Sequence, residues 1–319
     1  MFSDQQYNAA HNSAALIERS SQGTVALTGA DRASFLHALL TNDIAGLPKG
    51  RGVYAAYLTP QGRMISDMRV IETGSRLLLN VDRHVAAPLA ERFETLIFSE
   101  DVQAKDASDI AVLGVHGPAS ARMIQHATNV SVADLTSQYD NLTVESLTIV
   151  RDDALGVPGY DVYVPGSDRN AIRAKLIDAG AVPASDDVAE ALRIEAGRPL
   201  FGVDMTTDTI PLEAGIEDRA ISFTKGCYVG QEVIVRIMHR GHGRVARRLV
   251  SIVIAGGDVP ARGDKILLGD RTVGEITSAT ASPRAGSPLA LGYVQREHAV
   301  AGTEVTVGGS QARIDQAVD

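Results

Sequence analysis

The only cysteine of this 319-residue chain, Cys227, lies in a segment whose composition favours thiol chemistry. Residues 225–232 read KGCYVGQE, so Lys225 stands two positions before the cysteine, and Gly226 and Gly230 allow a tight, exposed turn. A neighbouring positive charge lowers the pKa of a thiol, and the thiolate is the reactive form. A free cysteine can also be a small buried apolar residue. Two interpretations therefore stay open, a reactive thiol and an inert one.

A basic stretch follows, in a chain whose formal net charge is −9. Between positions 225 and 248 lie six basic residues and one acid, Glu232: Lys225, Arg236, Arg240, Arg244, Arg247 and Arg248. The pattern is compatible with a solvated strand face, and equally with a site for a small anion or a phosphate backbone.

The first two thirds of the chain would form the fold that positions these residues. Its pattern of predicted strands and helices occurs twice. Each copy reads strand, helix, strand, strand, helix, which favours two related α+β units. We expect the first copy at 25–29, 31–40, 52–59, 63–71, 77–79 and 84–97, and the second at 110–116, 117 onward, 143–150, 160–164 and 168–179. A further helix over 185–197 precedes the cysteine segment.

After residue 248 the sequence pattern changes to short predicted strands separated by glycine turns. This pattern predicts a small β-barrel or sandwich. The fold class predicted is therefore α+β, with two related α/β units and a C-terminal small β-barrel. We expect domain boundaries at 1–238, divided into units of about 1–105 and 106–238, and at 239–319.

Two spaced motifs follow the predicted helix end. Residues 195–204 read EAGRPLFGVD, and residues 211–215 read PLEAG. Glu195 stands beside Ala196 and Gly197, where the helix should end and the side chain can turn into a cleft. A carboxylate can accept two parallel hydrogen bonds from a ring N–H and an exocyclic amine, as a pterin offers. From spacing alone, a surface glutamate is the other interpretation.

The run KGCYVGQE resembles the signature of YgfZ-type folate-binding proteins, members of the superfamily of glycine-cleavage aminomethyltransferases (GcvT). The pattern E-A-G-x-P-x-x-G-x-D followed by P-x-E-x-G is similar to the segment with which that superfamily grips the folate pterin. The likeness runs from about residue 25 to 307. It implies a GcvT-like folate-binding fold, with tetrahydrofolate or a one-carbon derivative as cofactor and Glu195 at the pterin-binding position.

The hairpin TPQGRMISD at 59–67 is similar to one that supplies an acid in the aminomethyltransferases, where paired aspartates end it. A fixed carboxylate stabilises a developing cation by electrostatics. This chain has Ser66 and Asp67, one carboxylate instead of two, which argues against aminomethyl transfer. Asp67 is a candidate catalytic residue, with an ordinary strand-face acid as the alternative.

The resemblance implies further site residues. The stretch VGEITSATASPRAGSPLALGYV at 273–294 is similar to the superfamily's barrel, whose T-S-x-x-x-S-P turn faces the central cleft. Arg284 in that turn and Arg236 in the basic stretch are candidates for the anionic folate tail. Tyr228 and Gln231 are candidates for folate binding within the signature, whereas Cys227 and Lys225 are candidates for thiol chemistry.

The hypothesis implied is a tetrahydrofolate-binding accessory protein for assembly or repair of iron–sulfur clusters in client enzymes, including tRNA-modifying ones. Because one cysteine cannot supply an all-cysteine cluster site, a cluster would belong to a client or assembly protein. The alternative is a folate-dependent aminomethyltransferase or other one-carbon transferase. A third hypothesis, an RNA-binding module, is disfavoured by net acidity and few aromatic residues (4%). No targeting pattern or membrane span is evident, so we expect a cytoplasmic protein.

Overall fold

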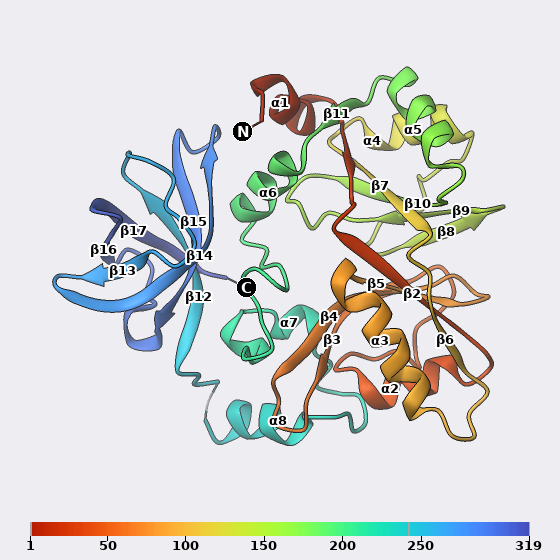
Figure 1. Ribbon diagram of the computed structural model, residues 1–319, viewed down its shortest axis with the longest axis horizontal. Helices are drawn as coiled ribbons and strands as arrows, with labels where there is room; N and C mark the ends of the chain where they lie inside the picture. The colour runs from red at the N-terminus through yellow and green to blue at the C-terminus, as the bar shows by residue number, and fades with distance from the viewer. Residues whose placement is uncertain (1, 242, 319) are drawn as a thin grey trace. The chain divides into compact units, whose positions relative to one another are not determined.

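The computed structural model describes residues 2–241 and 243–318. By contacts, the chain divides into two compact units, Met1–Ala55 with Ser66–Ala189, and Ala56–Ile65 with Glu190–Asp319. The first contains two β-sheets with helices, and the second contains a closed six-stranded barrel (Figure 1). The predicted α+β fold class is confirmed, whereas the predicted boundary at residue 239 stays a prediction.

The first unit holds a five-stranded sheet in the order β3-β4-β5-β2-β6 and a six-stranded sheet in the order β11-β1-β7-β10-β9-β8. The bounds in the first sheet are β2 (Gln22–Thr28), β3 (Gly52–Leu58), β4 (Met64–Glu72), β5 (Leu77–Asp82) and β6 (Gln103–Asp106). Those in the second are β1 (Ala15–Glu18), β7 (Ile110–His116), β8 (Asn141–Val144), β9 (Leu147–Arg151), β10 (Gly159–Pro165) and β11 (Val182–Ala184).

The spatial order of the strands repeats between the two sheets. In one sheet β3, β4, β5 and β2 are neighbours in that order, and in the other β8, β9, β10 and β7 follow the same order. The repeat breaks at one end, because β1 from the N-terminus pairs antiparallel with β7 and parallel with β11. The N-terminal strand thus completes the second sheet and not the first.

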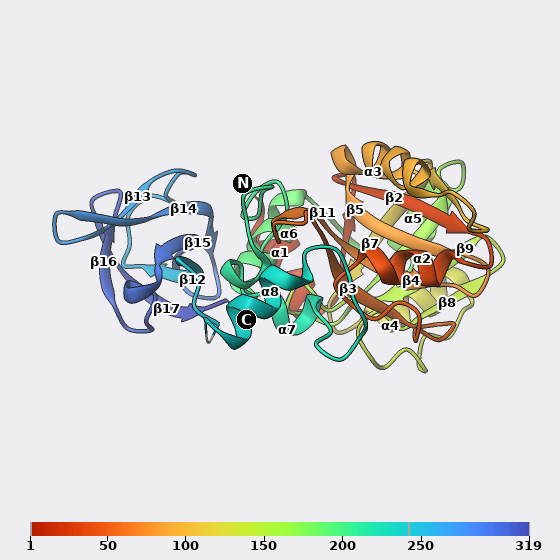
Figure 2. The same cartoon turned by 90° about the horizontal axis from the view of Figure 1, so that it is seen from below.

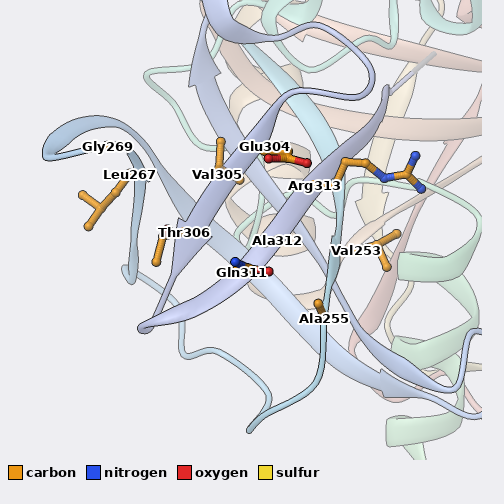
Figure 3. A pocket seen from close by; sticks show the side chains of 10 residues that line it. All are labelled: Val253, Ala255, Leu267, Gly269, Glu304, Val305, Thr306, Gln311, Ala312 and Arg313. Carbon is orange, nitrogen blue, oxygen red and sulfur yellow. The ribbon is translucent and has the colours of Figure 1, made fainter.

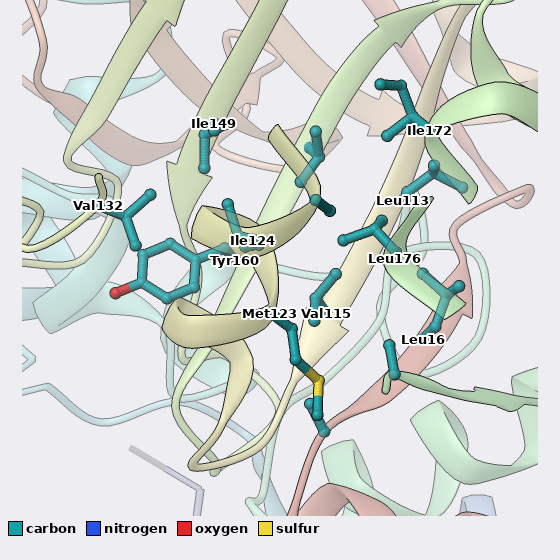
Figure 4. Close-up of a cluster of buried hydrophobic side chains, with 14 of the residues drawn as sticks. Leu16, Leu113, Val115, Met123, Ile124, Val132, Ile149, Tyr160, Ile172 and Leu176 are labelled. Atoms are coloured by element: carbon teal, nitrogen blue, oxygen red, sulfur yellow. The ribbon is translucent and has the colours of Figure 1, made fainter. Parts of the chain in front are cut away.

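Helices cover the two sheets in the first unit. They are α1 (Asp4–Asn12), α2 (Arg32–Leu39), α3 (Arg83–Leu96), α4 (Ser120–Thr128) and α5 (Arg169–Asp178). On the six-stranded sheet, Met123 and Ile124 of α4 and Leu176 of α5 pack with Leu113 and Ile149 of the strands in one apolar cluster (Figure 4). Burial of such a cluster is the main favourable term in folding.

Side chains from both sheets also share one cluster. Ile71 of β4 and Leu78 of β5 pack with Val112, Val150 and Tyr163 of the six-stranded sheet. Each sheet is therefore buried on both faces, by helices on one side and by the other sheet on the second, which explains its apolar strands.

The second unit begins with the turn of the β3–β4 hairpin and continues from Glu190 (Figure 2). Its helices are α6 (Asp186–Glu195), which starts just before the boundary, η1 (Pro211–Glu213), α7 (Glu217–Ala220), α8 (Gln231–His239) and η2 (Arg296–His298). The barrel strands are β12 (Arg247–Ile254), β13 (Lys265–Leu268), β14 (Arg271–Ser282), β15 (Ser287–Gln295), β16 (Glu304–Val307) and β17 (Ser310–Ala317), and β12 pairs with both β15 and β17 to close the barrel. Within the described residues, no helix has the length and apolar character to cross a bilayer.

Candidate functional site

The end of α6 presents Glu195 at the last helical position. The N–H of Arg198 bonds the carbonyl of Arg193 and the N–H of Gly197 bonds the carbonyl of Ile194, at 2.8 and 3.0 Å. Gly197 has φ 62°, so the helix closes with a Schellman motif, whose left-handed residue favours glycine. The predicted helix stop at this glycine therefore has a physical basis, and it fixes the backbone that carries Glu195.

The carboxylate of Glu195 forms a hydrogen bond with a residue of the barrel. The Ser282 hydroxyl, at the end of β14, donates to Oε1 of Glu195 at 2.5 Å. Ser282 is buried and Glu195 is half-buried. The predicted S-P turn of the barrel and the predicted pterin-binding glutamate are thus in direct contact, although 87 residues separate them in sequence.

A buried carboxylate, Asp204, joins the same two elements a short distance along the chain. Its Oδ2 accepts from Nη1 of Arg193 at 2.8 Å and from the N–H of Leu200 at 3.0 Å. Its Oδ1 accepts from the hydroxyl of Ser278 at 2.7 Å and from that of Thr277. Since Arg193 belongs to α6 while Thr277 and Ser278 belong to β14, Asp204 fixes the helix end against the barrel strand.

Cys227 lies in the exposed turn that precedes α8, and its side chain is exposed. Lys225 Nζ lies 5.2 Å from the ring centroid of Tyr228, over the ring. Tyr228 is 7% exposed, and burial raises the pKa of its phenol to about 12. The turn therefore has an anchored part, Tyr228 with Lys225 on its ring, and an accessible thiol.

The turn of the β3–β4 hairpin supports this loop. A Cβ at Gly230, whose φ is 84°, would lie 2.5 Å from the carbonyl oxygen of Thr59, and a Cβ at Gly62 would lie 3.0 Å from Val233. Arg63 Nη1 donates to the carbonyl of Asp208 at 2.6 Å. Gly230 of KGCYVGQE thus allows a close approach to the backbone of the hairpin turn, where the sequence pattern alone indicated only a turn.

The basic stretch divides into two parts. Arg236 and Arg240 are exposed on or next to α8, whereas Arg247 pairs with Glu213 (Nε to Oε2, 3.3 Å) and lies over the ring of Tyr293 at 4.3 Å. The element that carries Arg236 is a helix and not the strand face considered for it. Gln231 begins that helix, half-buried, and its N–H bonds the carbonyl of Tyr228 at 3.3 Å.

Arg284 is exposed in the turn between β14 and β15, two residues after Ser282. The turn closes through the N–H of Gly286 and the carbonyl of Ser282 at 2.9 Å. Arg284 therefore lies in the turn that carries the Glu195 contact, while its guanidinium faces solvent.

Asp67 lies on β4 and is assigned to the first unit, whereas the other candidate residues belong to the second. Its Oδ2 accepts from the phenol of Tyr54 at 2.6 Å. The neighbouring Ser66 is buried, and its hydroxyl donates to the backbone carbonyl of Asp67 at 2.7 Å. One carboxylate and one satisfied hydroxyl therefore occupy the positions where the aminomethyltransferase hairpin is expected to carry two acids.

A buried ionic cluster in the first unit has no counterpart in the sequence prediction. Arg19 bonds Asp152 at 3.4 Å and approaches Asp161 at 3.5 Å, and Arg69 approaches Asp152 at 3.5 Å. His116 Nε2 lies 3.4 Å from Asp161. Burial alone would raise the pKa of Asp161, but Arg19, then His116 and Arg69, together hold it well below the ordinary value. Since the partners lie far apart in the sequence, no local pattern indicated this cluster.

A pocket of about 330 Å³ opens on the barrel, between β12, β13, β16 and β17 (Figure 3). Glu304 and Arg313, which face each other in the β16–β17 register, are its charged lining residues. Its lining contains none of the site residues predicted from the sequence, so the pocket is separate from the candidate site.

Comparisons with known proteins match nearly the whole chain. The model of the GCVT N-terminal domain family matches residues 2–225, and that of the glycine cleavage T-protein C-terminal barrel domain matches residues 247–318. An aminomethyltransferase of Bacillus subtilis (strain 168) is 29% identical over 317 residues, covering 95% of this chain and 85% of the relative. One of Rubrobacter xylanophilus is 28% identical over 297 residues, covering 92% and 79%. The crystal structure of the glycine cleavage system aminomethyltransferase T from Bartonella henselae shares the fold, with a TM-score of 0.89, 21% identity, and coverage of 98% and 88%.

Proposed function

Because the chain belongs to the glycine cleavage T-protein family, we propose that it binds tetrahydrofolate or a one-carbon derivative and that Glu195 reads the pterin edge. The observation that carries the proposal is the Glu195 carboxylate, half-buried at a capped helix end and hydrogen-bonded by Ser282 at 2.5 Å. An acceptor held in this way suits paired N–H donors, such as a ring N–H and an exocyclic amine. Bound tetrahydrofolate would supply a carrier for one-carbon units.

Anaerobic titration calorimetry with tetrahydrofolate tests the binding. Glu195→Gln keeps the size of the side chain and removes its charge, so we expect a dissociation constant about 10- to 100-fold larger, the scale of hydrogen bonds to a charged group. Glu304→Gln, an exposed exchange of the same type on β16, serves as the matched control and should bind as the wild type does. Absence of binding by the wild-type protein would refute the proposal.

The first candidate activity is folate-dependent one-carbon transfer, which the relatives from Bacillus subtilis and Rubrobacter xylanophilus favour, since both are named aminomethyltransferases. Asp67, hydrogen-bonded by Tyr54 at 2.6 Å, would be the carboxylate that stabilises a cationic intermediate. This activity predicts turnover of tetrahydrofolate with an aminomethyl donor, loss of turnover in Asp67→Asn, and normal turnover in Cys227→Ser.

The second candidate activity is YgfZ-type support of iron–sulfur clusters in client enzymes, including tRNA-modifying ones. The specific observation that favours it is the exposed thiol of Cys227, within the KGCYVGQE loop that the hairpin turn supports. Ser66, in place of a second acid, points the same way. In this proposal folate and an iron–sulfur client or assembly protein are the partners, and Arg236 and Arg284 are available for the anionic folate tail.

One genetic experiment separates the two activities. In a strain that lacks the gene, activity of [4Fe–4S] enzymes is measured after complementation with wild type, Cys227→Ser or Asp67→Asn. Restoration by wild type and by Asp67→Asn, but not by Cys227→Ser, supports cluster maintenance. Normal [4Fe–4S] activity in the deletion strain, together with lost one-carbon transfer that Cys227→Ser restores, assigns the protein as a transferase.

A further inference from the structure

The hydrogen bonds around the Ser282 hydroxyl determine the direction in which its proton points. The backbone N–H of Ala285 donates to Oγ of Ser282 at 3.0 Å, and the side chain is 3% exposed. A hydroxyl carries one proton, and an amide N–H can only donate, so Oγ acts as acceptor toward Ala285. The hydroxyl proton therefore points to Oε1 of Glu195, 2.5 Å away.

The strand that carries Ser282 is fixed relative to the helix that carries Glu195. Four residues before Ser282 on β14, Ser278 bonds Asp204, and Asp204 bonds Arg193, two residues before Glu195 on α6. The two elements are thus joined at two places along their length, once through a buried carboxylate and once through the Ser282–Glu195 contact. Ser282 consequently approaches Glu195 from a rigid support.

The carboxylate of a glutamate needs such a contact to hold one orientation. The last torsion of the side chain is a rotation between sp³ and sp² carbons, which has a broad profile with no sharp staggered well. Two parallel hydrogen bonds to a planar ring require the carboxylate to lie in the ring plane. A hydrogen bond to one oxygen fixes that plane and, because a carboxylate has about four acceptor sites, leaves capacity for ligand donors.

We propose that Ser282 is a positioning residue for folate binding: it holds the Glu195 carboxylate in the plane in which it accepts the paired N–H groups of the pterin. This inference rests on the proposed tetrahydrofolate-binding function. It also makes the barrel part of the binding machinery, since the S-P turn of β14 then sets the geometry of a side chain on α6.

A double-mutant cycle measures whether Ser282 acts through Glu195. Dissociation constants for tetrahydrofolate are determined anaerobically for wild type, Ser282→Ala, Glu195→Gln and the double variant. We expect Ser282→Ala to weaken binding about tenfold in the wild-type background and less than about twofold in the Glu195→Gln background, because coupled residues are not additive. Ser282→Thr, which keeps a hydroxyl, should recover most of the affinity.

Controls separate positioning from general damage to the barrel. Ser287→Ala removes a hydroxyl at the position paired with Ser282 across the same hairpin, and it should leave the affinity unchanged. Thermal midpoints of all variants are measured beside their affinities. Equal weakening by Ser282→Ala with and without the Glu195 carboxylate overturns the positioning role, as does wild-type affinity in Ser282→Ala. A wild-type protein that does not bind tetrahydrofolate overturns the proposed function itself, and the inference with it.

Discussion

Oδ2 of Asp204 accepts a hydrogen bond from Nη1 of Arg193 at 2.8 Å, and both side chains are buried. Asp204 also accepts hydrogen bonds from the hydroxyls of Thr277 and Ser278 and from the backbone N–H of Leu200. Its carboxylate therefore has donors on α6, on β14 and in its own loop. The second unit is therefore held together at this point by one carboxylate, whose loss would leave the Arg193 guanidinium with Glu190 as its remaining acidic partner and would remove an acceptor of Ser278 and Thr277.

Replacement of Asp204 by alanine should strongly destabilise the second unit. Removing one member of a buried ion pair costs about 3–5 kcal/mol, and we expect the lower end, about 3 kcal/mol, because Glu190 still pairs with Arg193. Asp208→Ala is the matched control: Asp208 is exposed and pairs with exposed Arg63, so the expected change is within about 1 kcal/mol. Denaturant unfolding measures both variants, and comparable losses in the two would contradict the role given to Asp204.

Gly230 is expected to tolerate alanine less well than Gly202, although both have φ 84°. A left-handed conformation costs an L-residue about 1–2 kcal/mol, and Gly202→Ala should cost that much because open space surrounds its Cβ. At Gly230 the Cβ would in addition lie 2.5 Å from the carbonyl oxygen of Thr59. The extra loss should appear in denaturant unfolding, together with faster alkylation of Cys227 as the loop loosens. Equal unfolding costs at the two glycines would show that the hairpin does not hold the loop.

Elements whose signals are local could be predicted from the sequence. The β3–β4 hairpin was expected at 52–59 and 63–71 and is found at Gly52–Leu58 and Met64–Glu72, because apolar strands flank a Pro-Gln-Gly turn. The stop of α6 was likewise predicted, since Gly197 supplies the left-handed residue of its cap.

Elements defined by distant partners could not be predicted. The four-residue strand β1 gives no local indication that it pairs with β7 and β11, about 100 and 170 residues away. In α8 the run VIVRI has a strand's propensity, yet it folds as a helix whose Ile234 is fully buried, since packing overrides intrinsic preference. In the candidate site, Glu195 was named from its motif, but its contact with Ser282 depends on the tertiary fold.

Lys225 should increase the reactivity of Cys227. Lys225 stands two residues before the exposed Cys227, and a positive charge near a thiol increases its reactivity toward electrophiles. Because the site is exposed and solvent screens the charge, Lys225→Ala should slow alkylation by iodoacetamide at fixed pH only about two- to fivefold, and Lys225→Arg should leave the rate nearly unchanged. An unaltered rate in Lys225→Ala would show that Lys225 has no effect on the thiol. Its role would then be the contact with the Tyr228 ring, 5.2 Å away.

The buried ionic cluster of the first unit should make that unit sensitive to acid. Burial opposes the charge of Asp161, but Arg19, His116 and Arg69 outweigh burial, so the pKa of Asp161 in the folded protein lies below its ordinary value of 3.8. A carboxyl whose pKa is lower when folded than when unfolded contributes stability above the unfolded pKa and loses it as the pH falls toward the folded pKa. We therefore expect the thermal midpoint of the first unit to fall progressively below about pH 4.

The variant that tests this origin is Asp161→Asn, which removes the titrating group and keeps the size of the side chain. At pH 7 the variant should lose about 3–5 kcal/mol, because Arg19 and Arg69 then share one remaining carboxylate, Asp152. Between pH 4 and 3 its midpoint should change less than that of the wild type, since one proton fewer is taken up on unfolding. Circular dichroism across that range measures both curves. An acid dependence as steep in Asp161→Asn as in the wild type would assign the sensitivity to other carboxylates, because Asp161 would then bind its proton equally in both states.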